Sequence, residues 1–128
     1  MSVDLRNANG EEHSFSTIGW AFYLNLATVM YGWEKAGTLA PHAWGTSDGP
    51  WAGAYDWNAG QRVCASDAQA LADALEAYLS DPGGRAKALE VAGEIGRMIG
   101  CEITVDENDR SFIQPFIDFA RSGEFEIW

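Results

Sequence analysis

The longest uncharged stretch of the chain lies between His13 and Glu34. Its apolar residues do not form one stripe at a period of 3.6 residues. Ile18, Phe22 and Val29 fall on one side, Trp20, Leu24 and Tyr31 on a second, and Tyr23, Leu26 and Met30 on a third. A helix that is apolar nearly all round is buried on most of its surface. We therefore expect a central helix near residues 16–32 that the later elements enclose.

The same stretch is about long enough to span a membrane. Gly19, Asn25 and Thr28 dilute it, however, and the residues before it are acidic, with Glu11 and Glu12 in place of a basic flank. A signal peptide would begin with positive charge and end at a small-residue cleavage site. The pattern favours a buried helix of a cytoplasmic protein with no membrane contact.

Alternation of apolar and polar residues predicts strands at both ends of the chain. Val3 to Phe15 alternates around the turn at residues 7–10, and its Asn-Gly pair is typical of a hairpin because both residues tolerate positive φ. Ser16 or Thr17 can then cap the central helix. Residues 124–128 alternate again and predict a final strand.

Three more helices are predicted after residue 65. Ser66 and Gln69 fit a capping box, and the Asp-Pro-Gly-Gly turn at 81–84 ends the first of these helices. The second covers about 85–100 and the third 111–122. The residues expected to face inward are Leu89, Ala92, Ile95, Met98 and Ile99 in the second helix, and Phe112, Phe116, Phe119 and Ala120 in the third. We expect a single α+β domain over 1–128, with a small antiparallel sheet built from the N-terminal hairpin and the C-terminal strand and packed against about four helices.

Residues 34–61 differ from the rest because glycine and proline interrupt them too often for a long helix. We expect residues 54–57 to pair with 61–64 as a second hairpin, with its turn at 58–60. The aromatic side chains of this stretch either hold it against the body or line a binding surface. The candidate binding residues are Trp44, Trp51, Tyr55 and Trp57, with Asp48 and Asp56 beside them.

Charge and cysteine content exclude several classes of function. The 128-residue chain has a net charge of -11, which argues against nucleic acid and anionic membrane surfaces as partners. It permits a basic protein partner. Two cysteines, Cys64 and Cys101, are too few for a disulfide framework, so we expect reduced thiols, although one disulfide stays open.

Residues that could carry catalysis or bind metal are sparse. The spacings of His13, His42, Cys64 and Cys101 match no zinc pattern, and residues 106–109 lack the glycine and glutamate of a calcium loop. We expect no metal and no cofactor. Cys64 precedes a predicted helix N-terminus, which can activate a thiol, and His42 is the nearest base in sequence. A thiol enzyme is therefore an alternative, but a buried structural cysteine is favoured.

Short motifs spread along the chain resemble those of small bacterial and phage proteins of unknown function. They are Tyr31-Gly32-Trp33 with Gly37-Thr38, Asn58 to Val63, Asp67-Ala68 with Ala70 to Ala72, Phe116 to Phe119, and Gly123 to Ile127. These motifs coincide with predicted helix ends, turns and strands. The resemblance implies a bacterial or phage cytoplasmic protein and assigns no catalytic residue.

These observations favour a non-enzymatic, acidic interaction protein. It would bind a basic or concave protein as an inhibitor or immunity-type module, in the manner of a phage counter-defence protein, with the aromatic residues of 41–60 as anchors. The alternative is a small-molecule or nucleotide-binding domain that uses the same glycine-rich loop 41–60. A homodimer also stays open.

Overall fold

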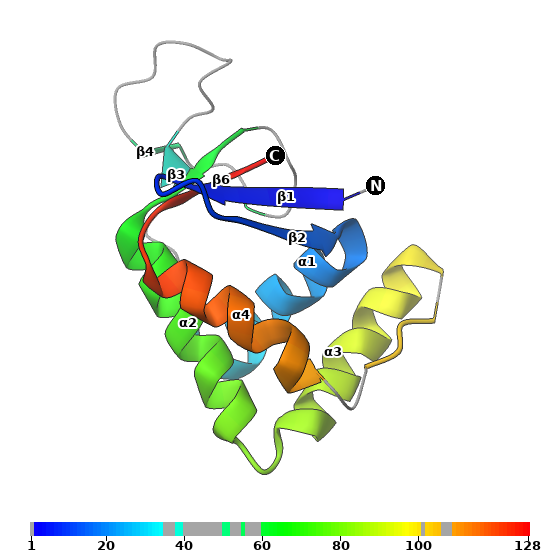
Figure 1. The fold of residues 1–128 in the computed structure, drawn as a ribbon. Coiled ribbons are helices and arrows are strands. Elements are labelled where there is room, and N and C mark those ends of the chain that lie inside the picture. The colour runs from blue at the N-terminus through cyan, green and yellow to red at the C-terminus, as the bar shows by residue number, and fades with distance from the viewer. Residues whose placement is uncertain are drawn as a thin grey trace.

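The computed structural model describes residues 2–34, 38–39, 50–51, 55, 60–100, 102–105 and 109–128. Its elements, in chain order, are β1 (Ser2–Asn7), β2 (Glu12–Ser16), α1 (Thr17–Asn25), the π-helical turn η1 (Leu26–Met30), β3 (Thr38–Leu39), β4 (Pro50–Trp51), β5 (Arg62–Val63), α2 (Ala65–Ser80), α3 (Gly84–Ile99), α4 (Asp109–Arg121) and β6 (Phe125–Ile127). The helices lie together on one side of the sheet (Figure 1). The predicted α+β class is confirmed.

The described strands form one antiparallel sheet in the order β2-β1-β6-β5-β3-β4. The predicted N-terminal hairpin is confirmed, with Val3 opposite Phe15. Gly10 closes its turn at φ 80°, a conformation that suits glycine. The predicted final strand is also confirmed. It lies inside the sheet, where Ile127 pairs with Leu5 of β1 and Phe125 pairs with Val63 of β5.

The predicted second hairpin is wrong in its pairing. β5 has β6 on one side, with Arg62 opposite Glu126, and β3 on the other, with Arg62 opposite Leu39. Both edges of β5 are therefore occupied by other strands. Of the predicted partner residues 54–57, Ala54, Asp56 and Trp57 lie outside the described part of the chain.

The central helix is present as α1 and η1, but it is not enclosed on every side. Ser16 caps it, since its Oγ accepts a hydrogen bond from the Gly19 N–H at 2.9 Å. Ile18 and Val29 are 43% and 59% exposed, so the expectation of burial all round is wrong there. The π-helical turn adds a residue to the helical period, which shifts the residues after Asn25 away from the faces that a regular α-helix would give them.

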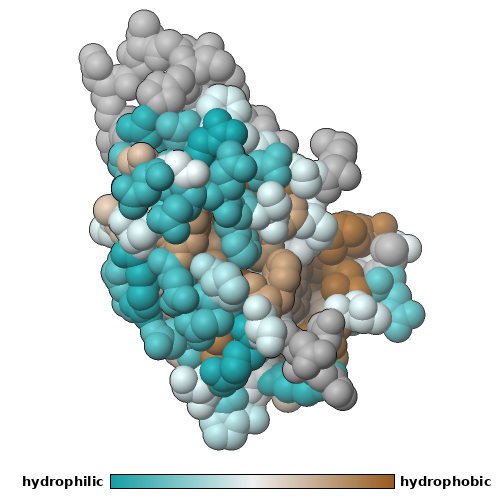
Figure 2. Space-filling view, viewed as in Figure 1, coloured by the Kyte–Doolittle hydropathy of each residue, from teal (hydrophilic) through white to brown (hydrophobic). Residues whose placement is uncertain are grey.

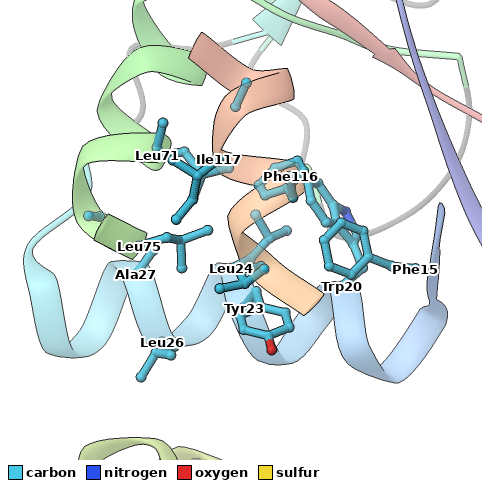
Figure 3. Close-up of a cluster of buried hydrophobic side chains, with 14 of the residues drawn as sticks. Phe15, Trp20, Tyr23, Leu24, Leu26, Ala27, Leu71, Leu75, Phe116 and Ile117 are labelled. Carbon is cyan, nitrogen blue, oxygen red and sulfur yellow. The ribbon is translucent and has the colours of Figure 1, made fainter. Parts of the chain in front are cut away.

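The core lies between the sheet and the helices. Trp20 of α1 is fully buried, and its ring meets those of Phe15 and Phe116 edge-on or tilted, at centroid distances of 5.3 and 5.7 Å. Leu71 and Leu75 of α2 complete the cluster beside α4, and the fully buried Leu26 belongs to the same core on the opposite side of its helix (Figure 3). This shared cluster ties α1, α2 and α4 to β2 in a single core. Among the described residues, no helix has both the length and the apolar character needed to cross a bilayer.

Several predicted helix details need correction. α2 begins at Ala65, and its cap residue is Cys64 with no side-chain capping bond, so the capping box of Ser66 and Gln69 does not form. The predicted inward face of α3 is only partly right. Ala92 is buried as predicted and Ile95 is partly buried against the core, but the helix also buries Ala88 and Val91. Leu89, Met98 and Ile99 of that helix are exposed, as is Phe112 of α4. Residues 102–105 follow α3 as an irregular segment and form no strand.

Candidate functional site

Most of the predicted binding residues fall outside what the structure describes. Trp44, Asp48, Asp56 and Trp57 lie in undescribed ranges, and Trp51 contributes only its place in β4, opposite Thr38 of β3. The proposal that they form a binding surface therefore stays a prediction. Among the predicted set, only Tyr55 has a described side chain.

Tyr55 is buried in the body of the protein. Its hydroxyl donates to Asp67 Oδ2 at 2.7 Å, and its carbonyl oxygen accepts from Trp20 Nε1 at 2.6 Å. Its ring stacks on that of Trp33 at a centroid distance of 5.9 Å. At 2% exposure, Tyr55 is itself held against α1 and α2, which matches the anchoring alternative for this residue.

A separate groove opens where the beginnings of α1 and α4 meet the segment 102–105. Its volume is about 380 Å³. The lining is mainly apolar and consists of Ile18, Gly19, Phe22, Tyr23, Ile103, Val105 and Phe112, with Ser16, Glu102 and Thr104 as polar members. We call it the α1–α4 groove. Ile18 and Phe112, which are 43% and 47% exposed, present apolar surface to whatever enters it.

The walls of the α1–α4 groove are fixed by packing beneath them. The Phe112 ring meets Phe15 edge-on at 5.4 Å and lies nearly parallel to Tyr23 at 6.1 Å. Tyr23 in turn meets Phe22 at 4.9 Å. Aromatic contacts of this kind restrict ring motion, so a ligand would meet a preformed surface.

His13 lies behind this wall. Its ring is surrounded by Phe15, Phe112, Phe116 and Phe119 at centroid distances of 5.0 to 6.3 Å. The Nε2 atom is buried and has no hydrogen-bond partner among the described residues. Burial lowers the pKa of His13 below its ordinary 6.5, because a charged imidazole would lose its hydration there.

The described residues offer little for catalysis. No group of three or more metal-ligating side chains converges in the described part of the chain. Cys64 precedes α2 with its Sγ 3.4 Å from Ser66 Oγ, while His42, its predicted base, lies outside the described ranges. The α1–α4 groove itself is lined by apolar groups with one carboxylate, Glu102. This arrangement suits the binding of an apolar group better than proton transfer.

Much of the positive charge in the described part of the chain is already engaged within the molecule. Arg6 pairs with Glu12 at 3.0 Å, Arg62 with Glu126 at 3.5 Å and Lys87 with Asp81 at 2.7 Å. Arg121 contacts both Asp73 and Glu76. Over the whole sequence, 19 acidic residues against 8 basic ones leave a net charge of -11.

Hydrophobic surface is unevenly distributed on the face of the molecule shown in Figure 2. In Figure 2 it gathers at the right of the view, where the start of α1 and the end of α3 lie in Figure 1, while most of the rest of this face is hydrophilic. The sequence pattern missed this surface, because Ile18 and Phe112 follow the same periodicity as core residues. Only the position of each helix relative to its neighbours distinguishes them.

Searches of protein-family models, curated proteins and solved structures gave no match to this chain. The resemblance to small bacterial and phage proteins stays a prediction.

Proposed function

We propose that this protein is a non-enzymatic, acidic interaction module, of the inhibitor or immunity type, that binds a basic protein partner. The α1–α4 groove receives an apolar side chain of that partner. The observation that supports this most is the pair of half-exposed residues, Ile18 and Phe112, on the preformed groove of a chain with net charge -11.

Charge and groove would act at different steps of binding. Opposite net charges speed the encounter of two proteins and suppress the wrong partners. A few buried apolar or aromatic contacts then hold the complex together. Trp44, Asp48, Trp51, Asp56 and Trp57 are proposed as a second contact region of the same interface.

The test compares two exposed apolar residues on the same helical segment. Ile18 lines the α1–α4 groove, whereas Val29 lies in η1 and is not part of its lining. Partners are captured from a bacterial lysate with the tagged wild-type protein and with the Ile18→Ser and Val29→Ser variants. The captured protein is then purified, and its affinity for each of the three is measured. We expect Ile18→Ser to weaken binding about tenfold or more, since burial of an isoleucine side chain is worth about 1.5–3 kcal/mol. Val29→Ser should bind like the wild type.

The dependence of the affinity on salt concentration tests whether the partner is basic. Because the attraction is between opposite charges, the dissociation constant should rise with ionic strength. Equal affinities for the two serine variants would reject the groove as the contact. An affinity that does not weaken with salt would reject the basic partner.

A second candidate function is the binding of a small apolar molecule in the same groove. Its volume of about 380 Å³ lies within the common range for ligand pockets, and its lining is mainly apolar. A ligand of this kind would raise the melting temperature in proportion to the logarithm of its concentration above the dissociation constant. Ile18→Ser should reduce that shift. The predicted small-molecule site in the loop 41–60 lies mostly outside the described residues.

A further inference from the structure

A second groove runs along the outer side of α3. It has a volume of about 340 Å³ and is lined by Leu89, Ala92, Gly93, Gly96, Arg97, Glu102 and Ile103. We call it the α3 groove. It shares Glu102 and Ile103 with the α1–α4 groove, so the segment 102–105 separates the two. Leu89 is 50% exposed at its edge.

The described fold leaves this side of α3 open. The helix packs against α1, η1 and α2 through Ala88, Val91 and Ala92, and of these three only Ala92 also borders the groove. At Gly93, an added Cβ would have only Arg97 Nη1 within 4 Å among the described residues, at 3.7 Å. Another backbone can therefore approach α3 closely at Gly93, and the apolar lining beside it would be buried by that approach.

Charge identifies the occupant that fits this groove. α3 carries three basic residues and two acidic ones, a net charge of +1, so the rest of the chain carries -12 of the total -11. Two copies of this acidic molecule repel each other over most of their surfaces. The sequences of α1 and α4 carry no net charge and that of α2 carries -3, so α3 is the described helix with a net positive charge. It can offer both an acidic residue, Glu90, and a basic one, Arg97, to a second copy.

We infer that two copies of this chain associate through α3, packed antiparallel about a two-fold axis near Gly93. In that arrangement Leu89 of each copy enters the α3 groove of the other, beside Gly93 and Gly96. The same symmetry brings Glu90 of one copy close to Arg97 of the other, and it does so twice, as a self-complementary interface requires. The inference goes beyond the proposed function and uses a different groove.

The test is sedimentation velocity on the purified full chain over a concentration series. We expect the wild type to pass from monomer to dimer as concentration rises, and to do so at lower concentration in higher salt, because salt screens the remaining repulsion. Gly93→Gln should abolish the dimer by blocking the close approach. It should keep or raise the melting temperature, since glutamine favours a helix more than glycine does.

Two further variants separate this interface from other apolar surface. Leu89→Ser should also abolish the dimer, whereas Val29→Ser removes an equally exposed apolar side chain from η1 and should leave it intact. A wild type that stays monomeric at every concentration and salt would overturn the inference. So would a dimer that survives Gly93→Gln. Neither outcome depends on the proposed protein partner, because only the purified chain is present.

Discussion

At the scale of single residues, the burial of His13 should make stability depend on pH. The unfolded chain takes up the His13 proton near its ordinary pKa of 6.5, but the folded chain does so only at lower pH, because burial among four phenyl rings lowers that pKa. The unfolded state therefore binds more protons below this value, and the free energy of unfolding falls as the pH drops from about 6.5 through the folded pKa.

His13→Leu isolates this contribution, since leucine suits the apolar site and does not titrate. Urea unfolding should show that the wild type loses more stability between about pH 7 and about pH 5 than the variant does. The wild type and the variant differ only at residue 13, so the difference between their pH profiles comes from that residue. Parallel pH profiles would show that His13 is protonated equally in the folded and unfolded states.

Tyr55 supports a second prediction at this scale. Tyr55→Phe removes the hydroxyl that donates to the buried Asp67 carboxylate at 2.7 Å, and it should cost about 1.5–3 kcal/mol of unfolding free energy. Tyr31→Phe is the matched control, because Tyr31 also donates to a carboxylate, that of Asp81, at 3.0 Å. Burial raises the pKa of Tyr31 to about 12, with the Asp81 contact adding to the shift, so its hydroxyl stays protonated.

The Tyr31→Phe control should lower the free energy of unfolding by less than about 1 kcal/mol. In that variant Asp81 keeps its contacts with Lys87 Nζ at 2.7 Å and with the Gly83 N–H at 2.8 Å. Equal losses in the two variants would contradict the anchoring role of Tyr55. The sequence identified Tyr55 as an aromatic residue that either anchors the stretch or binds a partner. The sequence does not distinguish these two roles. Asp67, the hydrogen-bond partner of Tyr55, lies in the first turn of α2, where an acidic residue is expected because it interacts favourably with the helix dipole.

At the scale of elements, the turn between α2 and α3 depends on one glycine and tolerates change at its neighbour. An added Cβ at Gly84 would lie 2.6 Å from the carbonyl oxygen of Tyr78, and that backbone atom cannot move aside easily. At Gly83 the nearest atom is Asp81 Oδ1 at 3.5 Å, and φ is -89°. Gly84→Ala should therefore destabilise the protein by about 1–3 kcal/mol.

Gly83→Ala should be neutral or stabilise by up to about 1 kcal/mol, because alanine reduces the freedom of the unfolded chain at a compatible conformation. Thermal and urea unfolding of both variants would measure the difference. If the two substitutions have the same effect, the close approach of α3 to the end of α2 is not present in solution.

Sequence periodicity predicted most of the secondary-structure elements, but it did not predict how they pair and pack. The hairpin, the final strand and the helix limits near 81–84 carry local signals, namely alternation, Asn-Gly and Pro-Gly, and these were confirmed. The pairing of β5 with β3 depends on residues far apart in sequence and had no local signal. In α3, alanine and glycine occupy the packed and open sides alike, so hydrophobicity favoured Leu89 and Met98 for the core. In the structure the small residues Ala88 and Ala92 are buried instead, on the side of α3 that contacts α1.

At the scale of the whole molecule, the two grooves and the acidic charge give a consistent division of surfaces. The α1–α4 groove, which presents apolar groups in an acidic protein, is the proposed contact for a basic partner. The α3 groove lies on a helix of net charge +1 and is the inferred contact for a second copy. Composition predicted the acidic character and permits a basic partner. It could not locate either groove, because each is formed by side chains that are brought together only when the segment 102–105 folds back beside α1, α3 and α4.

The net charge of -11 also leads to a prediction about stability. Repulsion among the 19 acidic residues opposes the compact state, and salt weakens it, since the screening length falls from about 10 Å at 0.1 M to about 3 Å at 1 M. Salt also weakens the ion pairs, such as Arg6 with Glu12, but exposed pairs contribute only about 0–1 kcal/mol each. The repulsion should dominate, so the urea midpoint should rise as sodium chloride is added.

A matched variant tests this balance. Glu34→Gln with Glu124→Gln removes two exposed negative charges, so it should raise the urea midpoint at low salt and reduce the further gain from salt. The wild type and the variant should converge at high salt, where the charges no longer interact at long range. A midpoint that falls as salt is added would mean that the internal ion pairs outweigh the repulsion. In that case the negative charge would be balanced within the fold, and the attraction of a basic partner would have to come from a local patch of acidic residues.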